Sequence, residues 1–301
     1  MSTKGEKQMK KEIFRGVGTA LVTPMRGEKI DHDALGKLID RQIDGGVGAI
    51  IIAGTTGEAS TLTSEEREEL YISAKRAISG RARLILGVGT NCTKTTIKYA
   101  KMAESVGCDG ILAVTPYYNK GTREGVYKHY EMLAKSTDLP IILYNVPSRT
   151  GLDLLPEQVY RLADFDNIVA IKEAKGSRER LSELVASGSI SVYTGCDGEM
   201  LDILELGGSG VISVLSNLYP RAASELYSAY YNGDTARAAN LFERLKPIIK
   251  ALFIETNPAP IKYALSSLGL SREDMRLPMH PVDEESRFAI SSAMDYFGEE
   301  S

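Results

Sequence analysis

The chain of 301 residues is long enough for one large α/β domain or two ordinary ones, and its 43% hydrophobic content fits a well-filled core. Its formal charge of −4, from 36 basic and 40 acidic side chains, gives no electrostatic support to a nucleic-acid partner. Three scattered cysteines argue against a disulfide framework, and no apolar run approaches the ~18 residues of a membrane span, so we expect a cytoplasmic protein with no membrane partner.

Residues 1–12 are rich in lysine and poor in apolar side chains, which predicts a disordered leader. Eight short runs rich in valine and isoleucine follow, and their starts lie 20 to 34 residues apart, the spacing of a strand, a loop and a crossover helix. Eight such units in a row predict a closed (β/α)8 barrel over residues 13–218. The runs are 18–23, 49–53, 83–87, 110–114, 140–145, 168–172, 190–194 and 210–214.

Helix signals fill the stretches between these runs. Thr63 and Glu66 have the spacing of a capping box, and Pro156 suits the first turn of a helix. Residues 219–301 are helical in pattern, with Pro247 and the turn at 257–260 as interruptions. Because a minimal barrel needs less helix, we expect a C-terminal extension of roughly three helices, packed beside the barrel or on a neighbouring subunit.

The run that begins at residue 168 contains a single lysine, Lys172, among small and β-branched residues. Because strand side chains alternate between faces, Lys172 shares a side with Ala170 and Ala174, whereas Val169 falls on the opposite side. An amine held away from water beside a carbonyl carbon can form a Schiff base. The alternative is an ordinary strand lysine with its stem packed and its head in water.

The residues that follow each run form the candidate site, because active sites of such barrels lie at the carboxyl ends of the strands. Residues 54–57 make a tight turn whose N–H groups can hold a carboxylate, although a plain turn is the simpler interpretation. Tyr144 shares the face of Ile142 and would point inward beside Lys172, unless its hydroxyl is only satisfied locally. Arg149 can clamp a carboxylate or lie on the surface.

Other chemistries find less support. Adjacent tyrosines such as Tyr117 and Tyr118 serve packing or subunit contact more often than catalysis. The three histidines lie far apart without a carboxylate at ligand spacing, which disfavours a metal site, and no dinucleotide or P-loop glycine pattern is present. Asp197 and Glu199 form a close acidic pair near a strand end, which we interpret as a solvated loop.

Five sequence blocks resemble the dihydrodipicolinate synthase / N-acetylneuraminate lyase family of pyruvate-dependent class I aldolases. They occur in order and at consistent spacing between about residues 16 and 281, so the resemblance is highly specific. It implies a (β/α)8 TIM barrel with a C-terminal helical extension, usually assembled as a homotetramer that is a dimer of dimers. The blocks are Gly54-Thr-Thr-Gly-Glu58, Thr115-Pro-Tyr-Tyr-Asn119, Tyr144-Asn-Val-Pro-Ser-Arg-Thr-Gly151, Ile171-Lys-Glu-Ala174 and Gly210-Val-Ile-Ser-Val214.

The resemblance implies four catalytic residues. Lys172 would form the Schiff base with pyruvate, and Tyr144 would be the general acid and base above it. Thr55 would relay the proton, and Tyr118 would complete the relay by reaching into the site of a neighbouring subunit across the tight dimer. The covalent imine on the lysine would take the place of a cofactor, and no metal would take part.

The resemblance also implies four substrate-binding residues. Thr56 would bind the pyruvate carboxylate, with Gly195 and Ile212 lining the same pocket. Arg149 would receive the carboxylate of L-aspartate 4-semialdehyde. The implied reaction condenses these two substrates in the diaminopimelate route of lysine biosynthesis. The implied enzyme class is a carbon–oxygen lyase of the class I (Schiff-base) aldolase type.

Two alternatives stay open within this resemblance. The chain could be an N-acetylneuraminate lyase or a 2-keto-3-deoxy sugar-acid aldolase, but a polyhydroxylated substrate calls for hydroxyl-binding side chains rather than for Arg149. It could also be a non-catalytic family member, but the four catalytic groups are all present. The resemblance further implies a regulatory pocket at the tight-dimer interface, which would include Asn91 and Tyr117. In relatives that lysine inhibits, an acidic residue usually stands at the position of Thr95. Because the ammonium of free lysine lacks this partner here, we expect weak inhibition by lysine.

Overall fold

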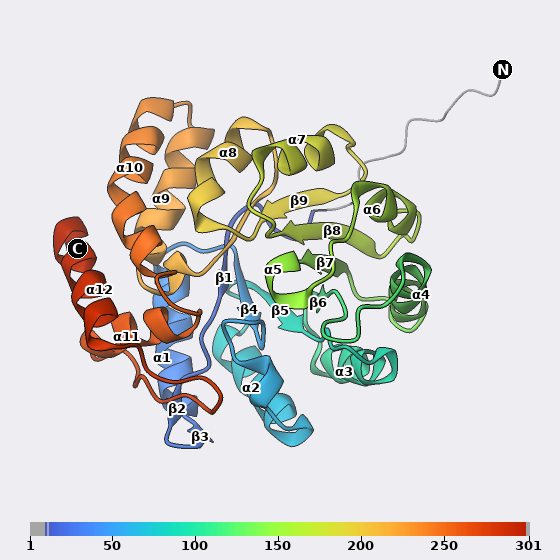
Figure 1. The fold of residues 1–301 in the computed structure, drawn as a ribbon, viewed down its shortest axis with the longest axis horizontal. Coiled ribbons are helices and arrows are strands. Elements are labelled where there is room, and N and C mark those ends of the chain that lie inside the picture. The colour runs from blue at the N-terminus through green and yellow to red at the C-terminus, as the bar shows by residue number, and fades with distance from the viewer. Residues whose placement is uncertain (1–9, 11, 299–301) are drawn as a thin grey trace.

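The computed structural model describes residues 10 and 12–298, and their fold is the predicted (β/α)8 TIM barrel with a C-terminal helical extension (Figure 1). Eight parallel strands close in the order β1-β10-β9-β8-β7-β6-β5-β4, so each barrel strand pairs with the next one along the chain. They are β1 (Gly16–Ala20), β4 (Ala49–Ile52), β5 (Arg83–Gly87), β6 (Gly110–Val114), β7 (Ile141–Asn145), β8 (Ile168–Glu173), β9 (Ser191–Thr194) and β10 (Gly210–Ser213).

The first strand lies earlier than the predicted run at 18–23. It begins at Gly16 and ends at Ala20, and Leu21 still donates a backbone hydrogen bond to Ile51 at 3.0 Å. The next backbone N–H, that of Val22, donates instead to the side-chain oxygen of Asn217 at 3.0 Å, and this bond takes the chain out of the sheet. A short hairpin of β2 (Met25–Arg26) and β3 (Lys29–Ile30) follows.

Helices surround the barrel, as the sequence pattern predicts. The capping box at the start of α2 is present, since Thr63 accepts from the N–H of Glu66 at 3.2 Å and Glu66 accepts from the N–H of Thr63 at 2.9 Å. The surrounding helices are α1 (His32–Asp44), α2 (Ser64–Ile78), α3 (Thr93–Val106), α4 (Arg123–Ala134), α6 (Pro156–Leu162), α7 (Arg178–Ala186), α8 (Met200–Glu205) and α9 (Pro220–Tyr231). Shorter helical turns are η1 (Ala59–Thr61), α5 (Pro147–Thr150), η2 (Asp197–Glu199) and η3 (Leu215–Asn217).

The C-terminal extension packs on the same chain. It consists of α10 (Thr235–Ala251), α11 (Ala259–Ser267) and α12 (Glu284–Phe297), and α9 packs against β1 and α1 as the last barrel helix (Figure 1). The interruption predicted at Pro247 is wrong, because α10 continues through this residue. Packing of α10 against α9 and α12 holds the helix together despite the missing N–H donor.

Two apolar layers form the core of the barrel. The outer layer lies between strands and helices, and the inner one fills the lumen with one or two side chains from most strands. Phe14 closes the amino-terminal end of the lumen, where its ring stacks on Tyr193 at 4.3 Å between centroids and its carbonyl accepts from the Tyr193 hydroxyl at 2.6 Å. Among the described residues, no helix is long and apolar enough to cross a membrane.

Most of the predicted leader, residues 1–9 and 11, lies outside the described residues. Lys10 is bonded to the barrel, because its ammonium donates to three backbone carbonyls between α6 and β8. These are the carbonyls of Ala163 at 2.6 Å, Phe165 at 2.5 Å and Ile168 at 2.8 Å. The three bonds attach Lys10 to the end of the barrel opposite the candidate site.

A buried ion pair joins the extension to the barrel. Lys262 of α11 is 0% exposed and pairs with the carboxylate of Glu58, which is 2% exposed and follows the turn at 54–57. The ammonium also donates to the carbonyl of Asp274 at 2.6 Å. Burial lowers the pKa of Lys262, and the charge of Glu58 opposes that effect. The extension therefore supports a loop of the candidate site.

Replacement of Lys262 by Met is expected to destabilise the protein, because Glu58 would be left buried without its cation. Losing one partner of a buried ion pair costs about 3–5 kcal/mol, and urea denaturation measures this as a fall in the free energy of unfolding. The double variant Glu58→Gln with Lys262→Met should regain part of the loss, because it buries no charge. A single variant as stable as the parent would contradict the structural role of the pair.

Candidate active site

The pairing of β7 with β8 decides which side chains enter the lumen. Ile141 pairs with Ile168, the register then shifts by one residue, and Ile142 pairs with Ala170. As a result Val169 and Ala170 both lie in the inner cluster, and the prediction that Val169 faces the opposite side is wrong. The extra residue acts as a β-bulge, a feature that re-aims side chains near active sites.

Tyr144 and Lys172 come together at the carboxyl ends of these two strands. They are directly paired across the sheet, and the Lys172 ammonium lies 4.5 Å from the centre of the Tyr144 ring. Lys172 is 5% exposed and Tyr144 is 6% exposed. No hydrogen bond or ion pair joins the Lys172 ammonium to another residue that the structure describes. The amine is therefore buried in the lumen, beside a phenol and without a bonded carboxylate.

Gly195, directly after β9, makes room for the stem of this lysine. A Cβ atom at Gly195 would lie 2.7 Å from Cε of Lys172 and 2.7 Å from Cβ of Ala174. Ordinary van der Waals contact requires a wider separation, so a larger residue would push the lysine away. Ile212 of β10 is also in the inner cluster and is fully buried.

The turn after β4 holds two threonines in different settings. Thr55 is half-buried and lines the site cavity, whereas Thr56 is 2% exposed and its hydroxyl accepts from the amide of Asn257 at 3.0 Å. Asn257 lies in the turn before α11, and its carbonyl accepts from the Arg149 guanidinium at 2.9 Å. The sequence showed only a turn at this position, so Asn257 was missed as a residue that joins Thr56 to Arg149.

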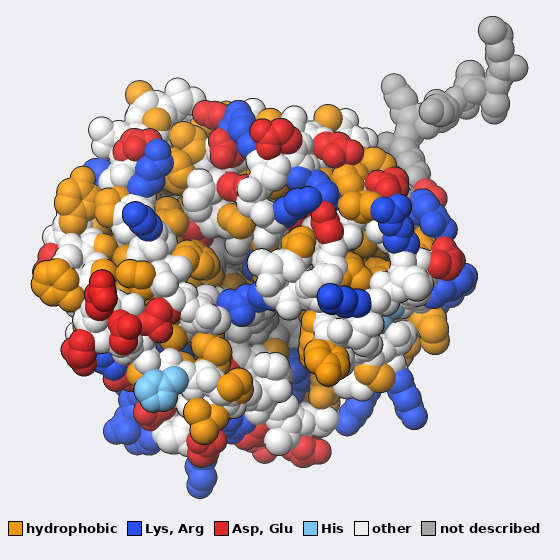
Figure 2. Space-filling model, viewed as in Figure 1, with side chains coloured by type: hydrophobic (Ala, Val, Ile, Leu, Met, Phe, Trp, Pro, Cys, Tyr) orange, Lys and Arg blue, Asp and Glu red, His pale blue; other side chains and the backbone are white. Residues whose placement is uncertain are grey.

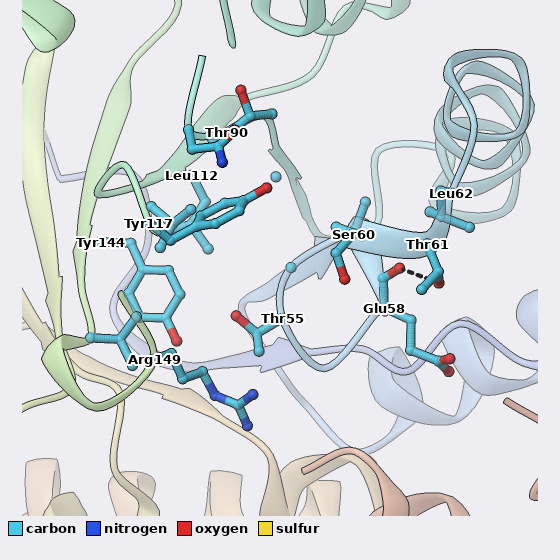
Figure 3. A pocket seen from close by; sticks show the side chains of 18 of the residues that line it. Thr55, Glu58, Ser60, Thr61, Leu62, Thr90, Leu112, Tyr117, Tyr144 and Arg149 are labelled. Atoms are coloured by element: carbon cyan, nitrogen blue, oxygen red, sulfur yellow. Dashed lines mark hydrogen bonds between the residues drawn. The ribbon is translucent and has the colours of Figure 1, made fainter. Parts of the chain in front are cut away.

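A cavity of about 430 Å³ opens at this end of the barrel, and the space-filling view shows the corresponding face hollowed near its centre (Figure 2). The hydroxyl groups of Thr55 and Tyr144 point into one space, with Arg149 beside them (Figure 3). Asn91 and Tyr117, the predicted regulatory residues, line the same cavity. The site and the candidate regulatory pocket are thus continuous within one chain.

Tyr118 does not join this group within one chain. Its side chain is 88% exposed and its backbone has a φ of +74°, a conformation uncommon for a residue other than glycine. Tyr117, its neighbour, is half-buried and lines the cavity. The structure thus brings together Lys172, Tyr144 and Thr55 at one end of the barrel but leaves Tyr118 at the surface.

Asp197, in the loop after β9, is buried and bonds to the backbone that follows β10. It is 1% exposed, and its carboxylate accepts from the N–H groups of Val214 at 3.0 Å and Leu215 at 2.9 Å. Burial raises its pKa. The prediction of a solvated loop is therefore wrong for Asp197, which holds the backbone that follows β10.

Among the described residues, no group of three His, Cys, Asp or Glu side chains could hold a metal ion.

The comparisons with known proteins point in one direction. The model of the dihydrodipicolinate synthetase family matches residues 13–296. The chain belongs to this family. It is 45% identical over 280 residues to the 4-hydroxy-tetrahydrodipicolinate synthase of Thermotoga neapolitana, covering 91% of this chain and 95% of the relative. It is 43% identical over 291 residues to that of Kosmotoga olearia, covering 95% and 99%.

Solved structures of the dihydrodipicolinate synthetase family share the fold. The enzyme from Thermotoga maritima superposes with a TM-score of 0.93 at 40% identity, over 95% of this chain and 99% of that one. The pyruvate complex of the Acinetobacter baumannii enzyme superposes with a TM-score of 0.92 at 39% identity, over 94% of this chain and 99% of that one.

Membership in the family confirms the predicted enzyme class, a lyase of the class I aldolase type, and the names of the relatives confirm the predicted synthase activity. The roles of single residues stay predictions.

Replacement of Gly195 by Ala is expected to displace Lys172, because the added methyl group would overlap the lysine stem. A misplacement of about 1 Å can cost ~10²-fold in rate. A crystal structure of the variant measures the displacement, and the rate at which Lys172 reacts with pyruvate measures its effect.

Gly198→Ala is the matched control for this substitution. It lies in the same loop, and its new Cβ would meet no atom within 4 Å, so it should leave both measurements unchanged. A Gly195→Ala variant with Lys172 in its original place and full reactivity would contradict the packing role.

Proposed function

We propose that Lys172 forms a Schiff base with pyruvate and that the resulting enamine adds to L-aspartate 4-semialdehyde. The observation that carries the proposal is the buried lysine amine 4.5 Å from the centre of the Tyr144 ring, at the end of a barrel of the dihydrodipicolinate synthetase family. The reaction would belong to the diaminopimelate route of lysine biosynthesis. We expect it to take place in the cytoplasm, with no nucleic-acid or membrane partner.

Imine formation needs a nucleophile and a proton donor at the same carbon. The Lys172 amine attacks C2 of pyruvate, and the carbinolamine that results must lose water before the imine exists. Tyr144, which pairs with Lys172 across the two strands, would protonate the departing hydroxyl, and a positioned acid contributes ~10²–10⁴-fold. The imine then withdraws electrons from the methyl carbon, so this route requires no metal or organic cofactor.

Carbon–carbon bond formation follows from the imine. Loss of a methyl proton gives an enamine, whose carbon attacks the aldehyde of the semialdehyde, and the new alkoxide takes up a proton. Thr55 faces the same space as Tyr144 and is suited to carry protons to and from the phenol. The amine of the condensed substrate then attacks the imine carbon, which releases Lys172 and closes the ring.

The relay requires a third hydroxyl, which we assign to Tyr118 of a second copy. Tyr118 is 88% exposed, so it is free to enter another chain's cavity. A homotetramer built as a dimer of dimers, with Tyr118 exchanged across the tight dimer, would complete each site in this way. The proposal thus makes assembly a condition of full activity.

The two carboxylates of the substrates would bind at different places. The hydroxyl of Thr56 accepts from Asn257, which leaves its own proton free to donate to the pyruvate carboxylate. Gly195 and Ile212 would form the walls beside it. Arg149 uses one N–H on the carbonyl of Asn257, and its other donors can bind the carboxylate of the semialdehyde. The positive charge favours this substrate over a polyhydroxylated sugar acid.

Free lysine would bind weakly in the part of the cavity that would lie at the tight-dimer interface of the proposed assembly. Asn91, Tyr117 and Thr95 line this part and offer amide and hydroxyl groups. Glu58 also lines the cavity, but its carboxylate is paired with Lys262. An ammonium ion entering here finds no free carboxylate among these residues. One family member, from Cyanidioschyzon merolae, has been solved with lysine bound.

Treatment with pyruvate and borohydride should add one reduced pyruvyl group to Lys172, which peptide mass spectrometry can locate. Lys172→Met should give no adduct. Lys175→Met removes a partly exposed lysine three positions along the chain and should keep the adduct. An unmodified Lys172 in the parent protein would refute the Schiff-base mechanism and favour a non-catalytic family member.

Arg149→Ala should impair use of the semialdehyde and spare imine formation. Loss of a hydrogen bond to a charged group corresponds to about a 10- to 100-fold fall in kcat/KM for the semialdehyde. The rate of borohydride trapping with pyruvate alone should stay within about twofold.

Arg123→Ala, which removes an exposed guanidinium at the start of α4, is the matched control and should change neither quantity. Equal losses in both quantities for Arg149→Ala would mean that Arg149 has another role. Faster cleavage of N-acetylneuraminate than turnover of the semialdehyde would favour the sugar-acid alternative.

A further inference from the structure

A buried polar pair lies directly behind the Tyr144–Lys172 pair. The next residues on the two strands, Asn145 and Glu173, also pair with each other, and they are 0% and 1% exposed. The amide of Asn145 donates to both carboxylate oxygens of Glu173 at 3.0 Å. The N–H of Lys175 donates to the same carboxylate at 2.9 Å. Because strand side chains alternate, this pair lies on the outer face of the barrel wall.

The Asn145 side chain is fixed in orientation. Its oxygen accepts from the N–H of Leu154 at 2.9 Å, and its amide also donates to Asp153 at 2.9 Å. Asp153 in turn accepts from Lys175 at 2.8 Å and from Arg180 at 2.9 Å. The amide therefore cannot turn over without losing several bonds, and it presents an N–H group to Glu173 in one direction only.

The register of these strands needs such a support. The ladder shifts by one residue at its start, between Ile141 and Ile142. If the shift were absent, Tyr144 would pair with Ile171, and Lys172 would face outward with Asn145. A slip of one residue turns every side chain of a strand to the other face. The Asn145–Glu173 pair is the last pair of the ladder, on the far side of the shift from its start.

We propose that Asn145 and Glu173 form a register clamp, a pair of positioning residues that holds Lys172 in the lumen against Tyr144. The clamp acts through the strands and touches no substrate. Its effect on the reaction rests on the function proposed above, whereas its effect on the position of Lys172 does not.

The clamp is complete when Glu173 is ionised, because the carboxylate then accepts from Asn145 at both oxygens. Burial raises the pKa of Glu173 to about 7, against the hydrogen bond from Asn145 and the charge of Arg180. The charge of Asp153 also raises this pKa, and the Cys196 thiol interacts with the same carboxylate. Protonation below about pH 7 places a hydrogen against the amide and weakens the clamp.

The same burial means that the clamp has a cost in stability. The pKa of Glu173 in the folded protein lies above the ordinary value of 4.5. As pH rises, this carboxyl therefore loses its proton at a lower pH in the unfolded chain than in the folded one. Between these two values the free energy of unfolding falls as pH rises, and the loss is complete above about pH 7. A neutral residue of the same shape should therefore stabilise the fold at pH 8 while weakening the clamp.

The test compares Glu173→Gln, Glu173→Leu and the control Glu179→Gln with the parent protein. Three quantities are measured: the rate of borohydride trapping with pyruvate at pH 6 and pH 8, the melting temperature at pH 8, and the Lys172–Tyr144 distance in crystal structures. Glu179→Gln makes the same exchange at an exposed glutamate in the first turn of α7 and should match the parent in trapping rate.

Glu173→Gln should melt no lower than the parent at pH 8 yet react about tenfold more slowly, because one charged hydrogen bond is lost. Its deficit should shrink at pH 6, where the parent has lost its own ionised clamp. Glu173→Leu should lose ~10²-fold in rate, with Lys172 displaced from Tyr144. Partial rescue by Gln relative to Leu separates positioning from a merely structural role.

Two results would overturn the clamp. The first is a folded Glu173→Leu protein with the parent's trapping rate and a Lys172–Tyr144 distance still near 4.5 Å. The second is a Glu173→Gln deficit that is the same at both pH values. If the parent protein forms no pyruvate adduct, the Schiff-base function fails instead, and the crystallographic distance in the Leu and Gln variants still decides the clamp.

Discussion

The one-residue shift in the pairing of β7 and β8 determines on which side of the barrel wall Lys172 lies. Side chains alternate between the two faces of a strand, so the residue of β8 that pairs with Ile142 decides whether Lys172 points into the lumen or outward. The shift places Val169 and Ala170 together on the inside, so that Lys172 enters the lumen beside Tyr144. Gly195 and the outer Asn145–Glu173 pair then fit around this arrangement.

Buried polar contacts from distant parts of the chain hold the loops at the site end. Asn257, in the turn before α11, joins the hydroxyl of Thr56 to the guanidinium of Arg149. Lys262 pairs with Glu58 at the end of the same turn. Loops at barrel ends carry function but have little packing of their own, so the C-terminal helices supply their support.

A single chain brings together most of the proposed site residues but not all of them. Lys172, Tyr144, Thr55 and Arg149 converge at one end of the barrel, whereas Tyr118 stays exposed. The cavity extends without interruption from Arg149 to Asn91 and Tyr117. An assembly that brings Tyr118 of one copy into another copy's cavity would therefore act on catalysis and on the candidate regulatory residues together.

The sequence by itself determined the barrel, the spacing of its strands, the capping box at Thr63 and the family, because these depend on local periodicity and on short ordered motifs. It also named Lys172 and Tyr144. Only the tertiary structure decided the inward place of Val169, the burial of Asp197 and the bridging role of Asn257. These features arise from barrel closure and from contacts between residues far apart along the chain, which no local pattern encodes.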